Sequence, residues 1–102
     1  MLQLRPGCEC CDRDLPPDSP EAMICSFECT FCRDCVTHVL FDVCPNCGGG
    51  FTPRPIRPAH NWHGDNFLGT YPALTVIRHR PVDADAHREL RARVGGLPPE
   101  QR

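Results

Sequence analysis

Apolar residues occur along this chain only in short runs, and each run fits one small element. Residues 21–28 contain four apolar side chains in a pattern that favours one short strand. Residues 34–41 hold Val36, Val39 and Leu40, which suits two helical turns. The run Ala73–Ile77 favours another short strand because it is rich in β-branched residues. The pattern therefore predicts a small α+β fold.

A longer amphipathic helix is expected near the carboxyl end. Asp83 is a suitable N-cap, and the helix should run to about Val94, where Gly95–Gly96 stops it. Ala86, Leu90 and Val94 recur every four residues and form a narrow apolar stripe. Such a stripe indicates a helix that packs on another part of the molecule.

Polar and proline-rich residues separate these elements. Residues 51–72 are rich in Pro, Gly, Asn and His, and Pro53, Pro55 and Pro58 exclude a helix and favour an extended strap. We therefore expect three parts: a module over residues 1–50, the strap over 51–72, and a short strand, helix and tail over 73–102.

The composition shows what must stabilise so small a chain. Its 102 residues include nine cysteines and twelve prolines but only seven aromatic residues. Domains with a core this small usually need a metal or disulfides. The cysteine number is odd, and the amino terminus lacks the apolar stretch of a signal peptide. We therefore expect a cytoplasmic protein that uses its thiols for metal, with a disulfide-linked secreted protein as the alternative.

Eight of the cysteines form four close pairs, all within the first fifty residues. Three pairs have two intervening residues and one pair has three, spacings that let a tight turn direct both sulfurs to one ion. The pairs are Cys8/Cys11, Cys25/Cys29, Cys32/Cys35 and Cys44/Cys47. Eight thiolates fill two tetrahedral zinc sites and leave no vacant position, which is typical of structural rather than catalytic sites. We expect two Zn²⁺ ions, in preference to iron, and no enzymatic activity, although spacing alone does not decide which pairs share an ion.

The gaps between these eight cysteines, 2, 13, 3, 2, 2, 8 and 2 residues, fit the cross-brace pattern of RING fingers. Further segments resemble a bacterial family catalogued as domain of unknown function 1272, over about residues 1–58. They are Leu4-Arg5-Pro6, Cys8-Glu9-Cys10-Cys11, Leu15-Pro16-Pro17-Asp18, Ile24-Cys25-Ser26-Phe27-Glu28-Cys29-Thr30-Phe31-Cys32 and Cys44-Pro45-Asn46-Cys47-Gly48-Gly49.

The resemblance implies a RING-like, treble-clef module with a short β-hairpin, a short helix and two interleaved zinc sites. The first site would use Cys8, Cys11, Cys32 and Cys35, and the second would use Cys25, Cys29, Cys44 and Cys47. No activity is attached to the bacterial family.

RING ubiquitin ligases grip a conjugating enzyme through a surface that this sequence contains only in part. Pro45 is present in the last knuckle, but Cys10 occupies the apolar position of the first knuckle and Gly48 replaces a cation. The helix offers Val36, Leu40 and Phe41 but no Trp. We therefore do not expect ligase activity.

Two residues near the pairs are possible alternative ligands. Cys10 has no partner, so it is either a reactive thiol or a small apolar residue packed in the knuckle. His38 follows Cys35 by three residues; it can substitute for Cys29 as a ligand, but we expect a helix residue in solvent or behind the ligands. His60 and His63 lack a carboxylate in fixed register and are expected to be loop residues.

The distribution of charge bears on possible partners. Residues 1–50 carry a net charge of −5 and residues 51–102 carry +3. Trp62, Phe67 and Tyr71 lie among four arginines, a mixture typical of single-strand nucleic-acid binders. We expect instead that the aromatic residues pin the strap to the zinc module while Arg54, Arg57, Arg78 and Arg80 remain in water.

The favoured function is therefore a structural or protein-interaction module with a protein partner and no membrane association. Nucleic-acid binding through the arginine-rich half, and a thiol redox or zinc-buffer role, are the alternatives.

Overall fold

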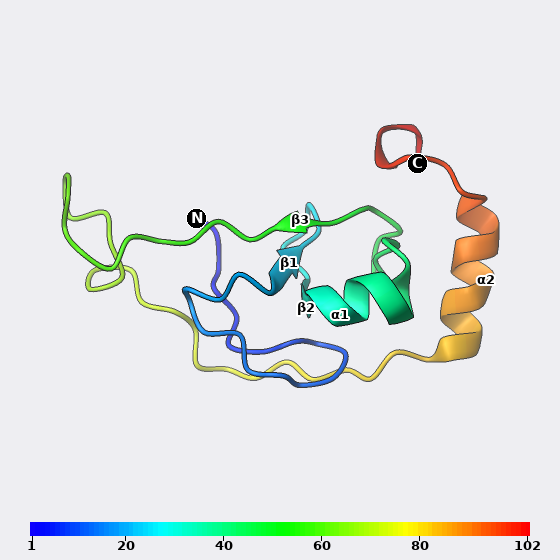
Figure 1. The fold of residues 1–102 in the computed structure, drawn as a ribbon, viewed down its shortest axis with the longest axis horizontal. Coiled ribbons are helices and arrows are strands. Elements are labelled where there is room, and N and C mark those ends of the chain that lie inside the picture. Colours follow the sequence, from blue (N-terminus) through cyan, green and yellow to red (C-terminus); the bar gives the residue numbers. More distant parts are fainter.

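A three-stranded antiparallel sheet lies at the centre of the molecule (Figure 1). The computed structural model describes all 102 residues. The strands are β1 (Ala22–Ile24), β2 (Thr30–Cys32) and β3 (Thr52–Pro53), in the order β2-β1-β3. Met23 of β1 lies opposite Phe31 on one side and Pro53 on the other. The module therefore continues beyond residue 50, because the first residues of the strap complete its sheet.

The short helix predicted over residues 34–41 is present and follows β2 directly. It begins as one α-helical turn, α1 (Arg33–Cys35), and widens into a π-helical stretch, η1 (Val36–Leu40). Phe41 ends it in the left-handed region with φ of 50°. The hairpin and helix together confirm the predicted small α+β fold.

Cysteines supply much of the core. Its largest fully buried side chains include Phe31, Leu4, Leu15 and Leu40, and Phe51 packs edge-to-face on Phe31 at 5.4 Å between ring centroids. Six cysteines are buried among these residues. After residue 50 only Arg54 and His87 are buried, so one small core lies within the cysteine-containing part.

The strand predicted over Ala73–Ile77 is wrong. Leu74 donates to the carbonyl of Leu4 (2.9 Å), but Thr75, Val76 and Ile77 make no backbone hydrogen bond. The adjacent N-terminal segment cannot serve as a partner strand, since Pro6 has no N–H and the Cys8 and Glu9 amides already donate to Arg13 and Thr30. A segment of high β-propensity does not form a strand unless a neighbouring strand edge has free N–H and C=O groups to pair with.

The predicted C-terminal helix is confirmed as α2 (Ala84–Val94). Asp83 Oδ1 accepts hydrogen bonds from the amides of Asp85 and Ala86, and Gly95 ends the helix with φ of 66°. The packed face differs from the expected stripe: Ala86 is exposed, while His87 is only 4% exposed. The helix therefore docks partly through a polar side chain.

In the strap, arginine side chains make the contacts with the module that were expected of the aromatic side chains. Arg54 is 4% exposed and donates to the carbonyls of Arg5, Leu15 and Pro16 at 2.9–3.2 Å. Arg57 donates to the carbonyls of Leu2 and Tyr71, both at 2.6 Å. Trp62 is 79% exposed, so it does not pin the strap. Buried arginine satisfies carbonyls that a tight proline-rich chain leaves without partners.

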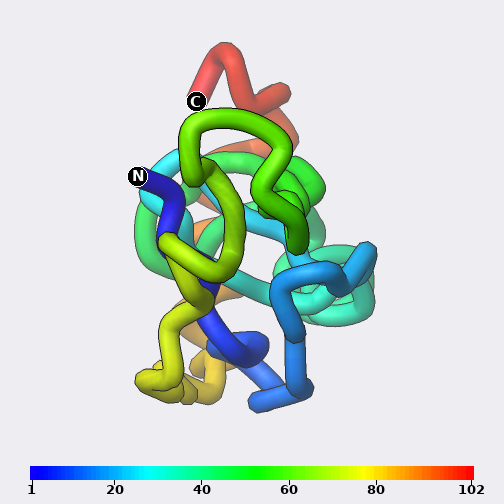
Figure 2. Tube along the Cα trace, turned by 90° about the vertical axis from the view of Figure 1, so that its left-hand side faces the viewer, coloured from blue at the N-terminus to red at the C-terminus, as the bar shows by residue number.

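The strap is extended only in its first part: its second part forms a loop, after which the chain turns back along the module. The loop of residues 58–68 projects from one end of the molecule, closed by the Leu68 amide and the Pro58 carbonyl (Figure 1). Residues 74–80 then run beside the N-terminal segment, as the yellow and blue tubes of Figure 2 show. No helix has the length and apolar character required to cross a membrane.

Candidate metal centre

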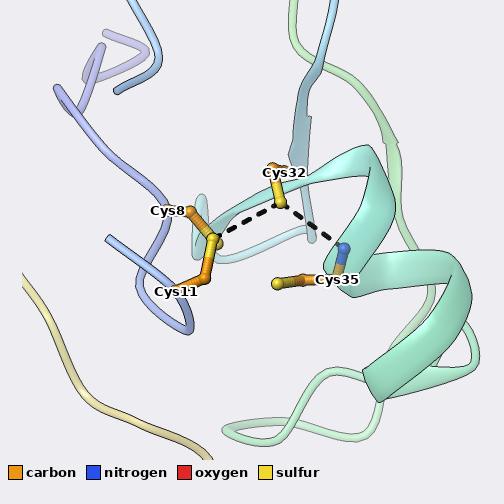
Figure 3. A group of neighbouring side chains, drawn as sticks. All are labelled: Cys8, Cys11, Cys32 and Cys35. Carbon is orange, nitrogen blue, oxygen red and sulfur yellow. Dashed lines mark hydrogen bonds between the residues drawn. The ribbon is translucent and has the colours of Figure 1, made fainter. Parts of the chain in front are cut away.

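Four thiols from two distant segments meet at the start of α1. Cys8 and Cys11 lie on the first knuckle, and Cys32 and Cys35 lie on β2 and α1. Their sulfurs lie within 4.8 Å of one another, and all four side chains turn toward one space (Figure 3). The Cys35 amide donates to Cys32 Sγ at 3.4 Å, which fixes one thiol against the helix N-terminus. We call this group the first cluster.

A second group of thiols forms between the β1–β2 turn and the last knuckle. Cys25, Cys44 and Cys47 have sulfurs within 4.8 Å of one another. The amides of Phe27 and Gly49 donate to the sulfurs of Cys25 and Cys47, both at 3.4 Å. We call these three residues the second cluster. The first and third pairs thus form one cluster, and Cys25 of the second pair joins the fourth pair in the other, which is a cross-brace-like arrangement.

Cys29 lies beside the second cluster but outside its 4.8 Å limit. Its sulfur accepts a hydrogen bond from Asn46 Nδ2 at 3.4 Å, and the Cys25 amide donates to its carbonyl at 3.2 Å. The side chain is buried. The last knuckle and the hairpin turn therefore hold Cys29 next to the three thiols without closing a four-sulfur group.

Burial controls the proton affinity of these thiols. It raises the pKa values of Cys29, Cys32, Cys35 and Cys44, and neighbouring thiols add to the effect. Burial also acts upward on the pKa of Cys8, but backbone N–H groups of Cys11, Cys32 and Cys10 outweigh it, and this pKa is lowered. Crowded, buried sulfurs hold protons unless a cation compensates their charge.

The donor set and its geometry fit a thiophilic cation. Zinc–sulfur bonds of about 2.3 Å in a tetrahedron place sulfurs about 3.8 Å apart, and Cys11 Sγ lies 3.7 Å from Cys32 Sγ. This separation far exceeds the roughly 2.05 Å of a disulfide, and all nine cysteines are free. The two clusters are therefore able to bind metal.

The two alternative ligands lie near the first cluster but outside it. Cys10 is partly buried and packs against the core, and its carbonyl lies 3.1 Å from His79 Nε2. His38 is exposed and lines a pocket together with Cys11, Cys32 and Cys35, so it lies at the first cluster and not beside Cys29, the ligand it was expected to replace. His60 contacts Trp62 edge-to-face in the projecting loop and, as expected, belongs to neither cluster, nor does His63.

Two buried polar residues beside the clusters were missed by sequence reasoning. Glu9 is 2% exposed and accepts the Thr30 amide at 2.7 Å, which ties the first knuckle to β2. His87 contacts the carbonyl of Val43 next to the last knuckle. The burial of His87 was missed because the stripe of Ala86, Leu90 and Val94 predicted a different packed face of α2. For Glu9, the only local indication of burial was its position between the two cysteines of a knuckle.

Comparisons with known proteins agree with this arrangement of cysteines. The chain is 60% identical to an uncharacterized protein of Rhizobium meliloti (strain 1021) over 81 residues, which cover 79% of this chain and 89% of the relative. No solved structure matches. A family model described as a protein of unknown function, DUF1272, matches residues 1–57. Because this match covers more than half of the chain, the protein belongs to the DUF1272 family.

Proposed function

We propose that this chain is a non-enzymatic, cytoplasmic, RING-like module that binds two zinc ions and presents a surface to a protein partner. The observation that carries the proposal is the alternate grouping of seven of the eight paired cysteines into two clusters. Cys29 would supply the fourth ligand of the second cluster, since its sulfur already accepts a hydrogen bond from Asn46 of the last knuckle. Two ions would then replace the large apolar core that this chain lacks.

Zinc is the cation that fits the donor set best. Thiolates bind zinc, iron and copper(I). A closed four-sulfur site suits a structural zinc ion, and it leaves no position for substrate or activated water. This closure supports a structural role over a catalytic one.

The C-terminal part of the chain covers the face that RING ubiquitin ligases use, and this argues against ligase activity. The surface that RING ligases use corresponds here to Cys10, Phe41, Pro45 and Gly48, and the C-terminal part lies over it. Arg91 stacks on the ring of Phe41 at 4.4 Å from its centroid. Pro45 lines a pocket with α2, and a Cβ at Gly48 would lie 3.9 Å from Leu90 and Val94.

Exposed apolar side chains supply candidate contacts for a protein partner. Phe27 projects from the hairpin turn, Trp62 from the loop, and Val76 and Ile77 from the extended segment. The nucleic-acid alternative is weakened, because Arg54 and Arg57 are committed to carbonyls of the chain. A protein surface is therefore the interaction that these residues support best.

Elemental analysis of freshly purified protein tests the proposal. We expect two zinc atoms per chain and a colourless sample. Removal of the ions by a chelator under reducing conditions should unfold residues 1–50, because apparent zinc-binding free energies of about 10–16 kcal/mol exceed the stability of such a small core. A metal-free native protein, native disulfides, or an unchanged circular dichroism spectrum after stripping would contradict it.

A further inference from the structure

The two clusters differ in the number of their thiols that line a surface pocket. A pocket of about 510 Å³ opens onto the first cluster, and three of its four thiols, Cys11, Cys32 and Cys35, line it. Asp34 and His38 form part of its wall, and Arg13 pairs with Asp34 at 3.5 Å across the rim. An ion held there would face solvent along one side.

The second cluster has one exposed thiol, Cys47, but no pocket that several of its thiols share. The neighbouring pocket of about 520 Å³ contacts only one of its thiols, Cys25. The C-terminal tail also lies over the last knuckle: Arg102 donates to the carbonyls of Asp42 (2.7 Å) and Gly48 (3.2 Å). Pro99 approaches Gly50 so closely that a Cβ there would lie 2.6 Å from its ring. These contacts cover the backbone of the last knuckle, while the side chain of Cys47 remains exposed.

The first cluster also has a replacement ligand within its open pocket. Cys11 is exposed, whereas Cys8, Cys32 and Cys35 are buried. His38 lies one helical turn after Cys35, is exposed, and makes no hydrogen bond. A neutral imidazole is a common zinc ligand and needs no buried charge.

We propose that the first cluster is an exchange site for thiophilic divalent cations, where Cys11 is the ligand that leaves and His38 the ligand that replaces it. This inference rests on the proposed function, since it requires metal at both clusters. With an ion bound, Cys11 would leave as a thiol that has taken one proton from solvent, and the imidazole of His38 would replace it as ligand. An external thiolate or chelator would then approach through the pocket.

Metal-release kinetics test the difference between the clusters. Zinc-loaded full-length protein is mixed with an excess of a chromogenic chelator, and absorbance reports released zinc. We expect two phases, each of one zinc per chain. Quenching between the phases with N-ethylmaleimide and mapping by peptide mass spectrometry should show modification at Cys8, Cys11, Cys32 and Cys35, with the second cluster protected. Simultaneous release, or earlier modification of Cys25, Cys44 and Cys47, overturns the proposal.

The role of His38 needs a matched pair of variants. His38→Ala should slow the fast phase, because no replacement ligand then fills the position that Cys11 leaves, and we expect a change of about tenfold, the lower end of the effects of residues around metal ligands. His63→Ala, a loop histidine outside both clusters, should leave both phases unchanged. An unchanged fast phase in His38→Ala overturns the assignment, provided that the variant still carries two zinc ions.

These outcomes separate the two proposals. A native chain with fewer than two ions contradicts the proposed function itself. Two ions per chain that leave in one phase contradict only the exchange site. Cadmium-loaded protein repeats the measurement with a second thiophilic cation, and it should show the same order of release.

Discussion

The Nε2 atom of His87 lies 2.8 Å from the carbonyl oxygen of Val43, and both residues are buried. A carbonyl oxygen only accepts, so Nε2 carries a proton and donates. Val43 directly precedes Cys44 of the second cluster, whereas His87 lies on α2. One buried hydrogen bond therefore joins the C-terminal helix to the last knuckle.

Substitution of His87 should release α2 from the module. His87→Ala leaves the Val43 carbonyl without its donor and opens a cavity, a loss of about 1–3 kcal/mol. Amide hydrogen exchange of the zinc-loaded protein should show faster exchange along α2. His60→Ala, in the exposed loop, is the control, and unchanged protection of α2 in His87→Ala would contradict the contact.

Arg54 should be the most sensitive residue of the strap. Its guanidinium group is buried, which lowers its pKa, and its two terminal nitrogens donate to three carbonyls. Arg54→Lys keeps the charge but loses the planar fork, so we expect a loss of about 2–3 kcal/mol in chemical denaturation.

Arg88→Lys is the matched control for that experiment. Arg88 pairs with Asp85 at 3.1 Å in full solvent, and its substitution should change the free energy of unfolding by less than about 0.5 kcal/mol. Equal effects of the two substitutions would show that the carbonyl contacts of Arg54 do not stabilise the fold.

Zinc affinity should fall as the pH falls. The ordinary thiol pKa is 9.0, and burial raises it at Cys29, Cys32, Cys35 and Cys44 in the folded, metal-free protein. Below pH 9 these four thiols are protonated in both folded and unfolded metal-free chains, so their titration alters metal-free stability only as the pH rises above that value. Bound zinc must displace their protons, and each proton displaced weakens binding by about 1.4 kcal/mol per unit fall in pH.

Competition with a chelator of known affinity at pH 6 and pH 8 measures this dependence. The free energy of unfolding of the zinc-loaded protein should decrease in parallel toward pH 6. A zinc affinity that does not vary with pH would contradict ligation by thiols that must lose their protons when zinc binds.

Trp62 offers a direct test of nucleic-acid binding. It is the only tryptophan and lies exposed on the loop, so a stacked base should quench its fluorescence. We expect no saturable quenching by single-stranded oligonucleotides at about 50 mM salt, since phosphate contacts supply most of such affinity and two of the four nearby arginines are occupied. Saturable, salt-sensitive quenching would favour the nucleic-acid alternative.

Local features of the fold were predictable because they depend on neighbouring residues. The ends of α2 follow from the side chain of Asp83 and the left-handed backbone of Gly95. The helix after β2 was also predictable, but its π-helical widening before Phe41 was not. The strand at Ala73–Ile77 failed because its partner would lie about seventy residues away, with its donors already bonded.

The sequence by itself determined three knuckles, since two residues between cysteines bring both sulfurs to one cluster, whereas the three residues between Cys25 and Cys29 did not. Only the tertiary structure decided which knuckles meet, because Cys11 and Cys32 are separated by twenty residues and meet through the path of the hairpin. It also decided that Arg54 is buried while Trp62 is exposed. The physical reason is that a proline-rich chain leaves carbonyls without hydrogen-bond donors. The guanidinium group of arginine has five N–H donors on a long side chain, whereas the indole of tryptophan has only one N–H.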